Sequence, residues 1–369
     1  MSKNKTKPKS VTKPAAKAKP KALIFLVVLL PIILTALAFV RIYLNQENAE
    51  KQGNEAKPGS AVTEEASPKE WTAAELNRIK EIPGEYFKEG KQPGTLTEIT
   101  YETKVNDGSG RTATKKAMVY LPHNYSQDKE YNTFYLLHGY GGSYQTFFGS
   151  AASPRALKTL LDNMIAQGEL LPTIVVTPGY TEEYTDYYQM QEELTAELTQ
   201  VLVPLVEGQY STYAKTTDAA GLMASRSHRG IGGFSMGGCT TWRALKNQGE
   251  FFQYYLPTSM PMYYDDNGYV QGESARSAKE ILQGLRKKGE AARPVYVFAA
   301  SGSEDFMSRA TEEQVNDLCS KANGNEEEFT YTEEGFDQGN ILFHSFSGRK
   351  HSFNESLVYF YNGLSRFYR

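Results

Sequence analysis

The sequence predicts an α/β domain with a mostly parallel central sheet, helices on both faces of that sheet, and one transmembrane helix in front of it. From about residue 95 onward, short apolar runs of strand length alternate with helical stretches, which is typical of a largely parallel sheet covered on both faces. Residues 22–40 form an uninterrupted apolar run. A hydrophobic content of 40% in 369 residues is enough for one large core.

The apolar run 22–40 is close to the roughly 20 residues that a helix needs to cross a bilayer. Eight lysines precede it and one arginine closely follows it. This asymmetry predicts a cytoplasmic basic tail over residues 1–21 and a transmembrane anchor over residues 22–41, with the rest of the chain outside the cell. A cleaved signal peptide is the alternative, because residues 36–38 (Ala-Leu-Ala) resemble a cleavage site. Both interpretations export the domain.

Residues 42–80 are predicted to be a flexible linker, and residues 81–369 the folded domain. The centre of the linker has mixed charge with Pro, Gly and Ser and lacks large apolar residues, so it cannot bury a core. The formal net charge is −3, and the lysine excess is confined to the first 21 residues. This distribution argues against a nucleic-acid partner.

The expected strands of the domain are short apolar runs of the length of buried strands. They are residues 95–105, 117–121, 134–137, 173–177, 230–234, 254–259, 295–300 and 341–346. Helices are expected over residues 191–207, where leucines and valines repeat at helical spacing, and over 236–245.

Residues 233–237 (Gly-Phe-Ser-Met-Gly) follow one expected strand directly and open an expected helix. This G-x-S-x-G pattern in a strand–turn–helix setting indicates a nucleophile elbow and therefore the α/β-hydrolase fold. The flanking glycines are needed because a Cβ would clash in so sharp a turn. The pattern predicts that Ser235 is a nucleophile.

A serine hydroxyl needs a base, which in this fold follows the serine in the chain and is oriented by an acid between them. Two histidines follow Ser235. His344 lies inside an expected strand, whereas His351 lies on a loop, so His351 is the predicted base and His344 a structural residue. Glu304 and Asp305 come just after a strand, and Asp305 is the preferred acid with Glu304 in reserve.

Acyl transfer also requires two donors for the oxyanion. The backbone N–H of Met236, directly after the serine, is the first predicted donor. The loop 138–142 (His-Gly-Tyr-Gly-Gly) follows an early strand, and its glycines allow the backbone to approach Ser235. The N–H of Tyr140 is the predicted second donor.

At these residues the sequence resembles the esterase D / feruloyl esterase family, which includes bacterial xylan-associated esterases, formylglutathione hydrolases and mycolyltransferases. The resemblance is carried by residues 135–142, 228–238 and 302–305 and spans about residues 95–369. The resemblance implies the same roles: nucleophile, acid and base for Ser235, Asp305 and His351, and oxyanion donors for Tyr140 and Met236. Residues 214–227, before the nucleophile strand, form a longer segment than the family leads us to expect.

Aromatic residues crowd the loops at the expected strand ends and are candidates for stacking on a phenolic acid or a sugar. Tyr144, Tyr184 and Tyr263 are the predicted substrate-binding residues. No cofactor and no metal site are predicted, and neither Cys239 nor Cys319 is given a catalytic role, since no activating base is evident.

Three functions remain open from the sequence. The leading one is an extracytoplasmic serine carboxylic-ester hydrolase that removes feruloyl or acetyl groups from plant cell-wall polysaccharide such as xylan. The second is an acyltransferase or esterase acting on lipids or glycans of the cell envelope, for which membrane tethering is equally suitable. The third, a non-catalytic surface-binding domain, is disfavoured by the complete set of serine, acid and histidine.

Overall fold

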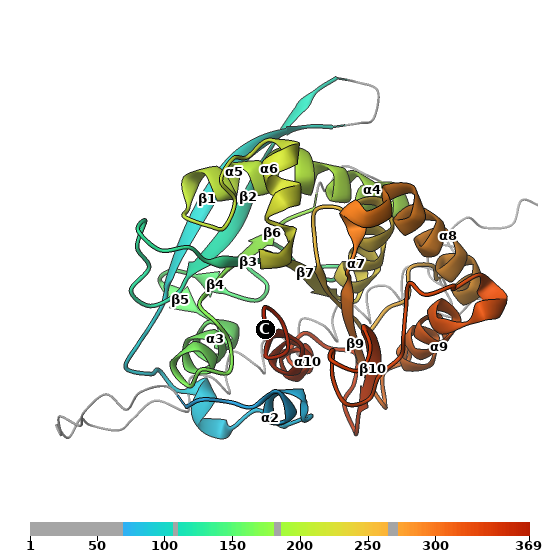
Figure 1. The fold of residues 1–369 in the computed structure, drawn as a ribbon. Helices are drawn as coiled ribbons and strands as arrows, with labels where there is room; N and C mark the ends of the chain where they lie inside the picture. Colours follow the sequence, from blue (N-terminus) through green and yellow to red (C-terminus); the bar gives the residue numbers. More distant parts are fainter. Residues whose placement is uncertain (1–68, 106–109, 181–185, 265–271) are drawn as a thin grey trace, which may run out of the picture. The chain divides into compact units, whose positions relative to one another are not determined.

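The computed structural model describes residues 69–105, 110–180, 186–264 and 272–369, which lie in one compact unit. Its centre is an eight-stranded sheet in the order β1-β2-β6-β3-β7-β8-β9-β10 (Figure 1). The strands are β1 Thr95–Lys104, β2 Thr112–Leu121, β3 Asn132–Leu137, β6 Thr173–Pro178, β7 Arg229–Phe234, β8 Tyr254–Thr258, β9 Tyr296–Gly302 and β10 Ile341–Phe346. Each of the eight expected strands is present within a few residues of its predicted bounds.

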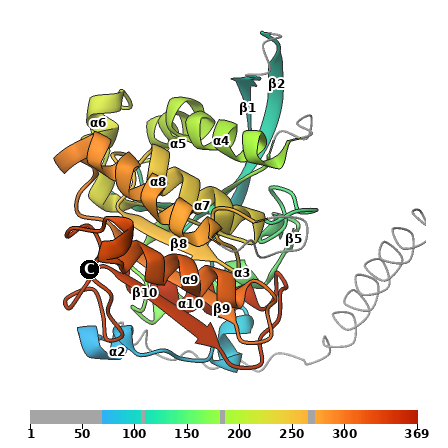
Figure 2. The same ribbon diagram turned by 90° about the vertical axis from the view of Figure 1, so that its right-hand side faces the viewer.

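The sheet is antiparallel at one edge and parallel elsewhere, so the expectation of a mostly parallel sheet is confirmed. β1 pairs antiparallel with β2, and β2 antiparallel with β6, while every later neighbour pair is parallel. The β1–β2 hairpin extends beyond the helices at one end of the molecule (Figure 2). A short second sheet joins β4 Gly149–Ser150 to β5 Ser153–Pro154.

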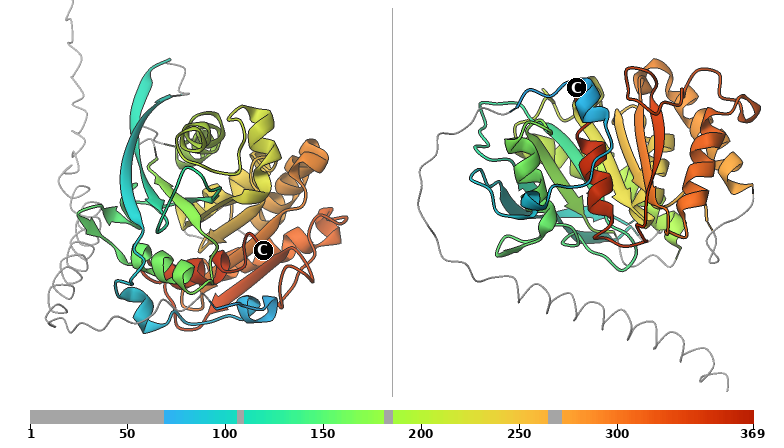
Figure 3. Two further views of the ribbon diagram at one scale, coloured as in Figure 1. Left: turned by 60° about the vertical axis from the view of Figure 1, so that its left-hand side comes forward. Right: turned by 90° about the horizontal axis from the view of Figure 1, so that it is seen from below.

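Helices cover both faces of the sheet (Figure 3). The longer ones are α3 Ala156–Ala166, α4 Tyr187–Glu197, α5 Val203–Gln209, α7 Met236–Asn247, α8 Glu273–Lys288, α9 Ser308–Cys319 and α10 Ser356–Leu364. Short helices are α2 Ala73–Asn77 and α6 Ala219–Ala224. Helices α3 and α10 pack on one face, and α4, α5, α7, α8 and α9 on the other.

Alternating side chains of the inner strands divide the interior into two cores. In β3, Tyr135 and Leu137 belong to the core under α4 and α7, whereas Phe134 and Leu136 belong to the core under α3 and α10. This two-residue period is the geometry of a pleated strand. Because both faces are covered, all six residues of β3 are buried, and the strand appears in the sequence as two polar residues followed by the apolar run 134–137.

The helix expected over residues 191–207 is longer and contains a wider turn. Between α4 and α5 the backbone forms a π-type turn over Leu198–Leu202, which ends two residues before Pro204. A proline within a helix has no N–H to donate and its ring clashes with the carbonyl four residues earlier. The wide turn accommodates that clash without ending the helix.

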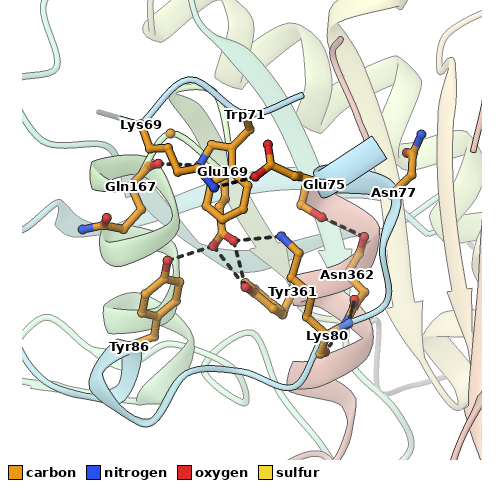
Figure 4. Close-up of polar contacts among 12 residues, drawn as sticks. Lys69, Trp71, Glu75, Asn77, Lys80, Tyr86, Gln167, Glu169, Tyr361 and Asn362 are labelled. Atoms are coloured by element: carbon orange, nitrogen blue, oxygen red, sulfur yellow. Dashed lines mark hydrogen bonds and ion pairs between the residues drawn. The ribbon is translucent and has the colours of Figure 1, made fainter. Parts of the chain in front are cut away.

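The predicted linker 42–80 differs from the structure at its end. Residues 69–91, here called the N-terminal strap, pack along α3 and α10 rather than leaving the domain (Figure 4). The Trp71 indole N–H donates to the carbonyl of Gln167 at 2.8 Å, and Lys80 is bonded through both backbone groups to Asn362 at 2.8 Å. The folded domain therefore begins before residue 81.

Glu169 is the centre of the strap's polar contacts. Its carboxylate, 1% exposed, accepts hydrogen bonds from Lys80 at 3.1 Å, Tyr86 at 2.9 Å and Tyr361 at 3.0 Å (Figure 4). A buried carboxylate needs such partners to offset its loss of hydration. The contacts thus join the start of the domain to its C-terminal helix.

The unusually long segment 214–227 lies at the start of β7, at the end of that strand opposite Ser235. It forms α6 and a 3-10 turn, Arg226–His228. The Arg226 guanidinium donates to the carbonyls of Phe252 at 2.7 Å and Gly249 at 3.0 Å. The segment therefore ties β7 to its neighbours.

Within the described ranges, no helix is long and apolar enough to cross a membrane. The predicted tail 1–21 and anchor 22–41 lie outside the described residues, as does most of the predicted linker.

Candidate active site

Ser235 occupies a strained turn between β7 and α7. Its φ of 57° and ψ of −120° are unfavourable for a residue with a side chain. The turn closes only around glycines: a Cβ on Gly237 would lie 2.1 Å from the carbonyl oxygen of Leu137, and one on Gly233 would lie 2.5 Å from Gly237. This geometry is that of a nucleophile elbow, which places a hydroxyl above the carboxyl end of the sheet.

Three side chains that are far apart in the sequence form a chain of hydrogen bonds. The Nε2 atom of His351 lies 2.9 Å from Ser235 Oγ. The Nδ1 atom of His351 lies 2.9 Å from one oxygen of the Asp305 carboxylate and 3.0 Å from the other. An imidazole held in this way can take a proton from the serine while the carboxylate stabilises the resulting imidazolium.

The loops that carry the acid and the base are bonded to each other through their backbones. The N–H of Ser303 donates to the carbonyl of Phe346 at 2.8 Å, and the N–H of Glu304 donates to the carbonyl of Arg349 at 3.0 Å. The hydroxyl of Ser303 accepts from the N–H of Gly348 at 2.9 Å. Because β9 and β10 are parallel neighbours, both loops leave the sheet at the same edge. The hydrogen bonds between the loops then hold Asp305 next to His351.

Exposure increases from the acid to the base. The Asp305 side chain is 0% exposed and the His351 side chain 19%. The second contact of Asp305 is the N–H of Met307, which donates to its Oδ1 atom at 2.8 Å. The imidazole also lies against two aromatic rings, with centroid distances of 4.7 Å to Phe234 and 4.5 Å to Phe306. A shielded carboxylate and a partly open imidazole suit a base that must reach a substrate.

Two backbone N–H groups beside Ser235 are available to bind an anion. Met236 is the first residue of α7, so its N–H has no partner within the helix. Among the hydrogen bonds of the described residues, none involves the N–H of Tyr140 either. The N-terminus of α7 adds its partial positive charge at the same place.

His138 fixes the direction of the Tyr140 N–H. The carbonyl of Gly139 accepts from the N–H of Gly142 at 3.1 Å and lies 2.8 Å from His138 Nδ1. Burial lowers the pKa of His138 to about 4, so the ring is neutral at neutral pH, and because a carbonyl oxygen can only accept, this contact favours the tautomer with its proton on Nδ1. In a trans peptide the C=O and the next N–H point in opposite directions. Holding the Gly139 carbonyl inward therefore turns the Tyr140 N–H outward.

The alternatives considered for the acid and base lie elsewhere. Glu304 is exposed and its carboxylate is 3.6 Å from Lys350. His344 is a half-buried residue of β10 whose ring packs edge-on against Phe346. The structure therefore pairs Asp305, and not Glu304, with His351.

Both cysteines are free thiols, so they do not pair with each other. Cys239 is buried beside the amide of Gln191, and burial raises the pKa of its thiol to about 11. A thiol with so high a pKa is not a nucleophile at neutral pH. The described residues contain no cluster of potential metal ligands.

Of the three predicted substrate-binding tyrosines, the structure describes Tyr144 and Tyr263, and both hydroxyls are bonded to glutamates. Tyr184 lies outside the described residues. The Tyr144 hydroxyl donates to Glu98 at 2.7 Å, and the Tyr263 hydroxyl donates to Glu280 at 2.7 Å. Within the described part of the chain, no hydrogen bond or ring contact joins Tyr144 or Tyr263 to Ser235 or His351.

Two aromatic residues that sequence reasoning did not select are exposed beside the site. Phe306 follows Asp305 and is 67% exposed, and Tyr187 is 46% exposed with its ring 5.4 Å from that of Tyr140, itself 71% exposed. The position of Phe306 directly after the candidate acid is a feature of the sequence that could have placed it near the site. Nothing in the sequence indicated that Tyr187 would meet Tyr140, because helix α4 brings it there.

The fold and these side chains define a carboxylic-ester hydrolase of the α/β-hydrolase fold, and comparisons with known proteins agree. The family model described as "Putative esterase" matches residues 112–259. The feruloyl esterase module from Clostridium thermocellum, solved as a serine-to-alanine mutant with sinapinate, is 32% identical, with a TM-score of 0.68 over 84% of this chain and 97% of that one. The chain belongs to the esterase D / feruloyl esterase family.

Two further proteins are similar to this chain, one of them much longer and the other less similar in sequence. Endo-1,4-beta-xylanase Y from Acetivibrio thermocellus is 34% identical over 294 residues, which are 79% of this chain and 25% of that protein. The chain thus spans about a quarter of that relative. A ferulic acid esterase from Anaeromyces mucronatus is 20% identical with a TM-score of 0.55, over 77% of this chain and 95% of that one, and shares the fold.

Proposed function

We propose that this chain is a feruloyl esterase that releases hydroxycinnamic acids from the sugars of xylan, with Ser235, His351 and Asp305 as its catalytic triad. The observation that carries the proposal is the 2.9 Å contact of Ser235 Oγ with His351 Nε2, next to the backbone N–H groups of Tyr140 and Met236, which donate to no group among the described residues. The substrate class is supported by the feruloyl esterase module and by the xylanase, which both align along most of this chain.

In the first half of the reaction, Ser235 Oγ attacks the ester carbonyl carbon while His351 Nε2 takes the hydroxyl proton. The carbonyl oxygen becomes an oxyanion and receives hydrogen bonds from the N–H groups of Tyr140 and Met236. Asp305 stabilises the imidazolium and holds its Nδ1 proton. When the intermediate collapses, the bond to the alcohol oxygen breaks and His351 returns its proton to that oxygen.

In the second half, water replaces the departed alcohol. His351 takes a proton from the water, the hydroxide attacks the acyl-serine, and the same two N–H groups bind the second oxyanion. Collapse breaks the acyl–Ser235 bond, and the proton on His351 goes to Ser235 Oγ. The products are the free carboxylic acid and the original enzyme.

An aromatic acyl group suits the surface beside the oxyanion loop. Tyr140 and Tyr187 meet edge-to-face at 5.4 Å, and both are exposed. Such rings offer an apolar wall to a phenolic ring. An acetyl group would use little of it, and this favours a hydroxycinnamoyl ester over an acetyl ester.

We further propose that the domain works outside the cell, held by residues 22–41. The lysine-rich tail before this apolar segment supports that orientation. Polymeric xylan cannot enter a cell, so an external enzyme fits the proposed substrate. In intact cells, added protease should release active domain, whereas activity that appears only after lysis would contradict the orientation. Active enzyme already free in the medium would indicate a cleaved signal peptide.

Turnover of methyl ferulate, ethyl acetate and acetylated xylan by residues 69–369 tests the acyl preference. We expect the highest kcat/KM for the ferulate ester. A preference for acetyl esters would refute the feruloyl assignment. Acyl transfer to an added glycan or lipid alcohol in preference to water would instead identify an acyltransferase.

A further inference from the structure

Phe306 is an exposed aromatic ring attached to the catalytic loops. It follows Asp305 directly, is 67% exposed, and its ring centroid lies 4.5 Å from that of His351, with the planes at 42°. Apolar side chains of this size are usually buried because exposure forgoes about 25 cal/mol per Å² of apolar area. Its contact with His351 uses only part of the ring.

The chemistry of the site determines which part of a substrate comes near Phe306. His351 Nε2 must deliver its proton to the leaving alcohol oxygen, which therefore lies within about 3 Å of that nitrogen. The carbonyl oxygen points to the Tyr140 and Met236 N–H groups. The carbon skeleton of the alcohol therefore lies on the imidazole side of the site, and Phe306 is an exposed ring in contact with that imidazole.

The two loops that carry Phe306 and His351 also carry an exposed ion pair. Glu304 and Lys350, 56% and 72% exposed, lie 3.6 Å apart and join the same two loops, one residue before Asp305 and one before His351. An exposed ion pair of this kind contributes little to stability, so its groups are free to exchange partners with a ligand. A flat apolar face with charged groups beside it suits a sugar, which has an apolar C–H face and a rim of hydroxyls.

We propose that Phe306 is the platform of a leaving-group subsite that stacks on the sugar carrying the ester, with Glu304 and Lys350 beside it for the sugar hydroxyls. This inference rests on the proposed function for the identity of the alcohol. It assigns Phe306 to the alcohol side of the ester, opposite in role to the Tyr140–Tyr187 pair on the oxyanion loop.

The test compares two esters that share an acyl group and differ in the alcohol: methyl ferulate and a feruloyl pentose oligosaccharide. The measured quantity is the ratio of kcat/KM for the pentose ester to that for the methyl ester. Stacking that covers about 50 Å² of apolar area predicts that Phe306→Ala lowers this ratio about 10-fold. Phe306→Leu, which keeps an apolar side chain against His351 but has no flat face, should lower it similarly, and Phe306→Trp should retain it.

Phe87→Ala is the matched control, because Phe87 is a 44% exposed aromatic residue of the N-terminal strap, and it should leave the ratio unchanged. An equal loss on both esters in the Ala and Leu variants would overturn the proposal and make Phe306 a residue that only positions His351. The same ratio can be measured with an acetylated pentose and ethyl acetate. If the feruloyl assignment is wrong, the wild-type enzyme will prefer acetyl esters to ferulate esters. That result does not depend on the ratio measured in the Phe306 variants.

Discussion

Ser235 Oγ and His351 Nε2 lie 2.9 Å apart although 116 residues separate them in the sequence. The elbow after β7 fixes the first atom, and the loop after β10, bonded to the loop after β9, fixes the second. Because both loops leave the same edge of one parallel sheet, a small set of backbone contacts determines the geometry on which the proposed chemistry depends.

His351→Ala should lower kcat on a short activated ester by roughly 10⁴-fold or more, since a serine without its base is a weak nucleophile and triad members act as a unit. His344→Ala is the matched control and should retain most of the activity, because its ring packs against Phe346 and not against Ser235. Steady-state kinetics of the two purified variants give the comparison. A larger loss for His344→Ala would refute the assignment of the base.

Asp305→Asn should cost far more activity than Glu304→Gln. The Asp305 carboxylate is buried against His351 Nδ1 at 2.9 Å, whereas Glu304 is exposed. An amide at position 305 can present its NH₂ group to the imidazole and favour the wrong tautomer, for which a loss of about 10⁴-fold is typical. Equal activity of the two variants, measured by kcat, would contradict the pairing.

His138→Leu should lower kcat roughly 10²–10³-fold, the usual cost of losing one oxyanion donor, with a small change in KM. Leucine cannot donate to the Gly139 carbonyl, so the Tyr140 N–H would lose its fixed direction. His138→Asn supplies a donor again and should recover much of the rate. If both variants lose rate and thermal stability in parallel, His138 serves packing only.

Stability should fall as the pH drops from about 6.5 to about 4, in part through His138. Burial lowers the pKa of His138 in the folded protein from 6.5 to about 4, so the unfolded chain binds a proton at higher pH than the folded one. The neutral His138 ring contributes about 3 kcal/mol to the free energy of unfolding. This contribution is complete above pH 6.5 and is lost as the pH falls toward 4. Urea unfolding of the wild type and His138→Asn at both pH values measures it. An identical pH dependence in the two proteins would contradict the shift.

The strands and the meeting of Ser235, His351 and Asp305 could be predicted because their signals are local. The inner strands are buried on both faces and therefore largely apolar, and the elbow needs glycines at fixed offsets from Ser235. The order of serine, acid and histidine along the chain then restricted the candidates to Asp305 or Glu304 and to His351 or His344. Backbone contacts between the two loops decide between them.

The N-terminal strap and the aromatic surroundings of the site depend on contacts between distant segments. The composition predicts a linker up to residue 80, yet Trp71 and the capping box of Thr72 and Glu75 are local signs of an earlier ordered start. The selected Tyr144 and Tyr263 are bonded to glutamates of β1 and α8. Exposed tyrosines cannot be sorted into binding and structural residues until their partners are known.

Mass analysis of the protein after treatment with a serine-directed phosphonate ester tests the central claim most directly. The account predicts one adduct on the peptide that contains Ser235, and its formation should slow greatly in His351→Ala, because the imidazole activates the hydroxyl. Cys239 lies four residues further along the same peptide, but its thiol has a raised pKa, so fragmentation should place the adduct on the serine. An adduct on Cys239 or on another serine, or equal labelling in His351→Ala, would contradict the assignment of Ser235 as a nucleophile activated by His351.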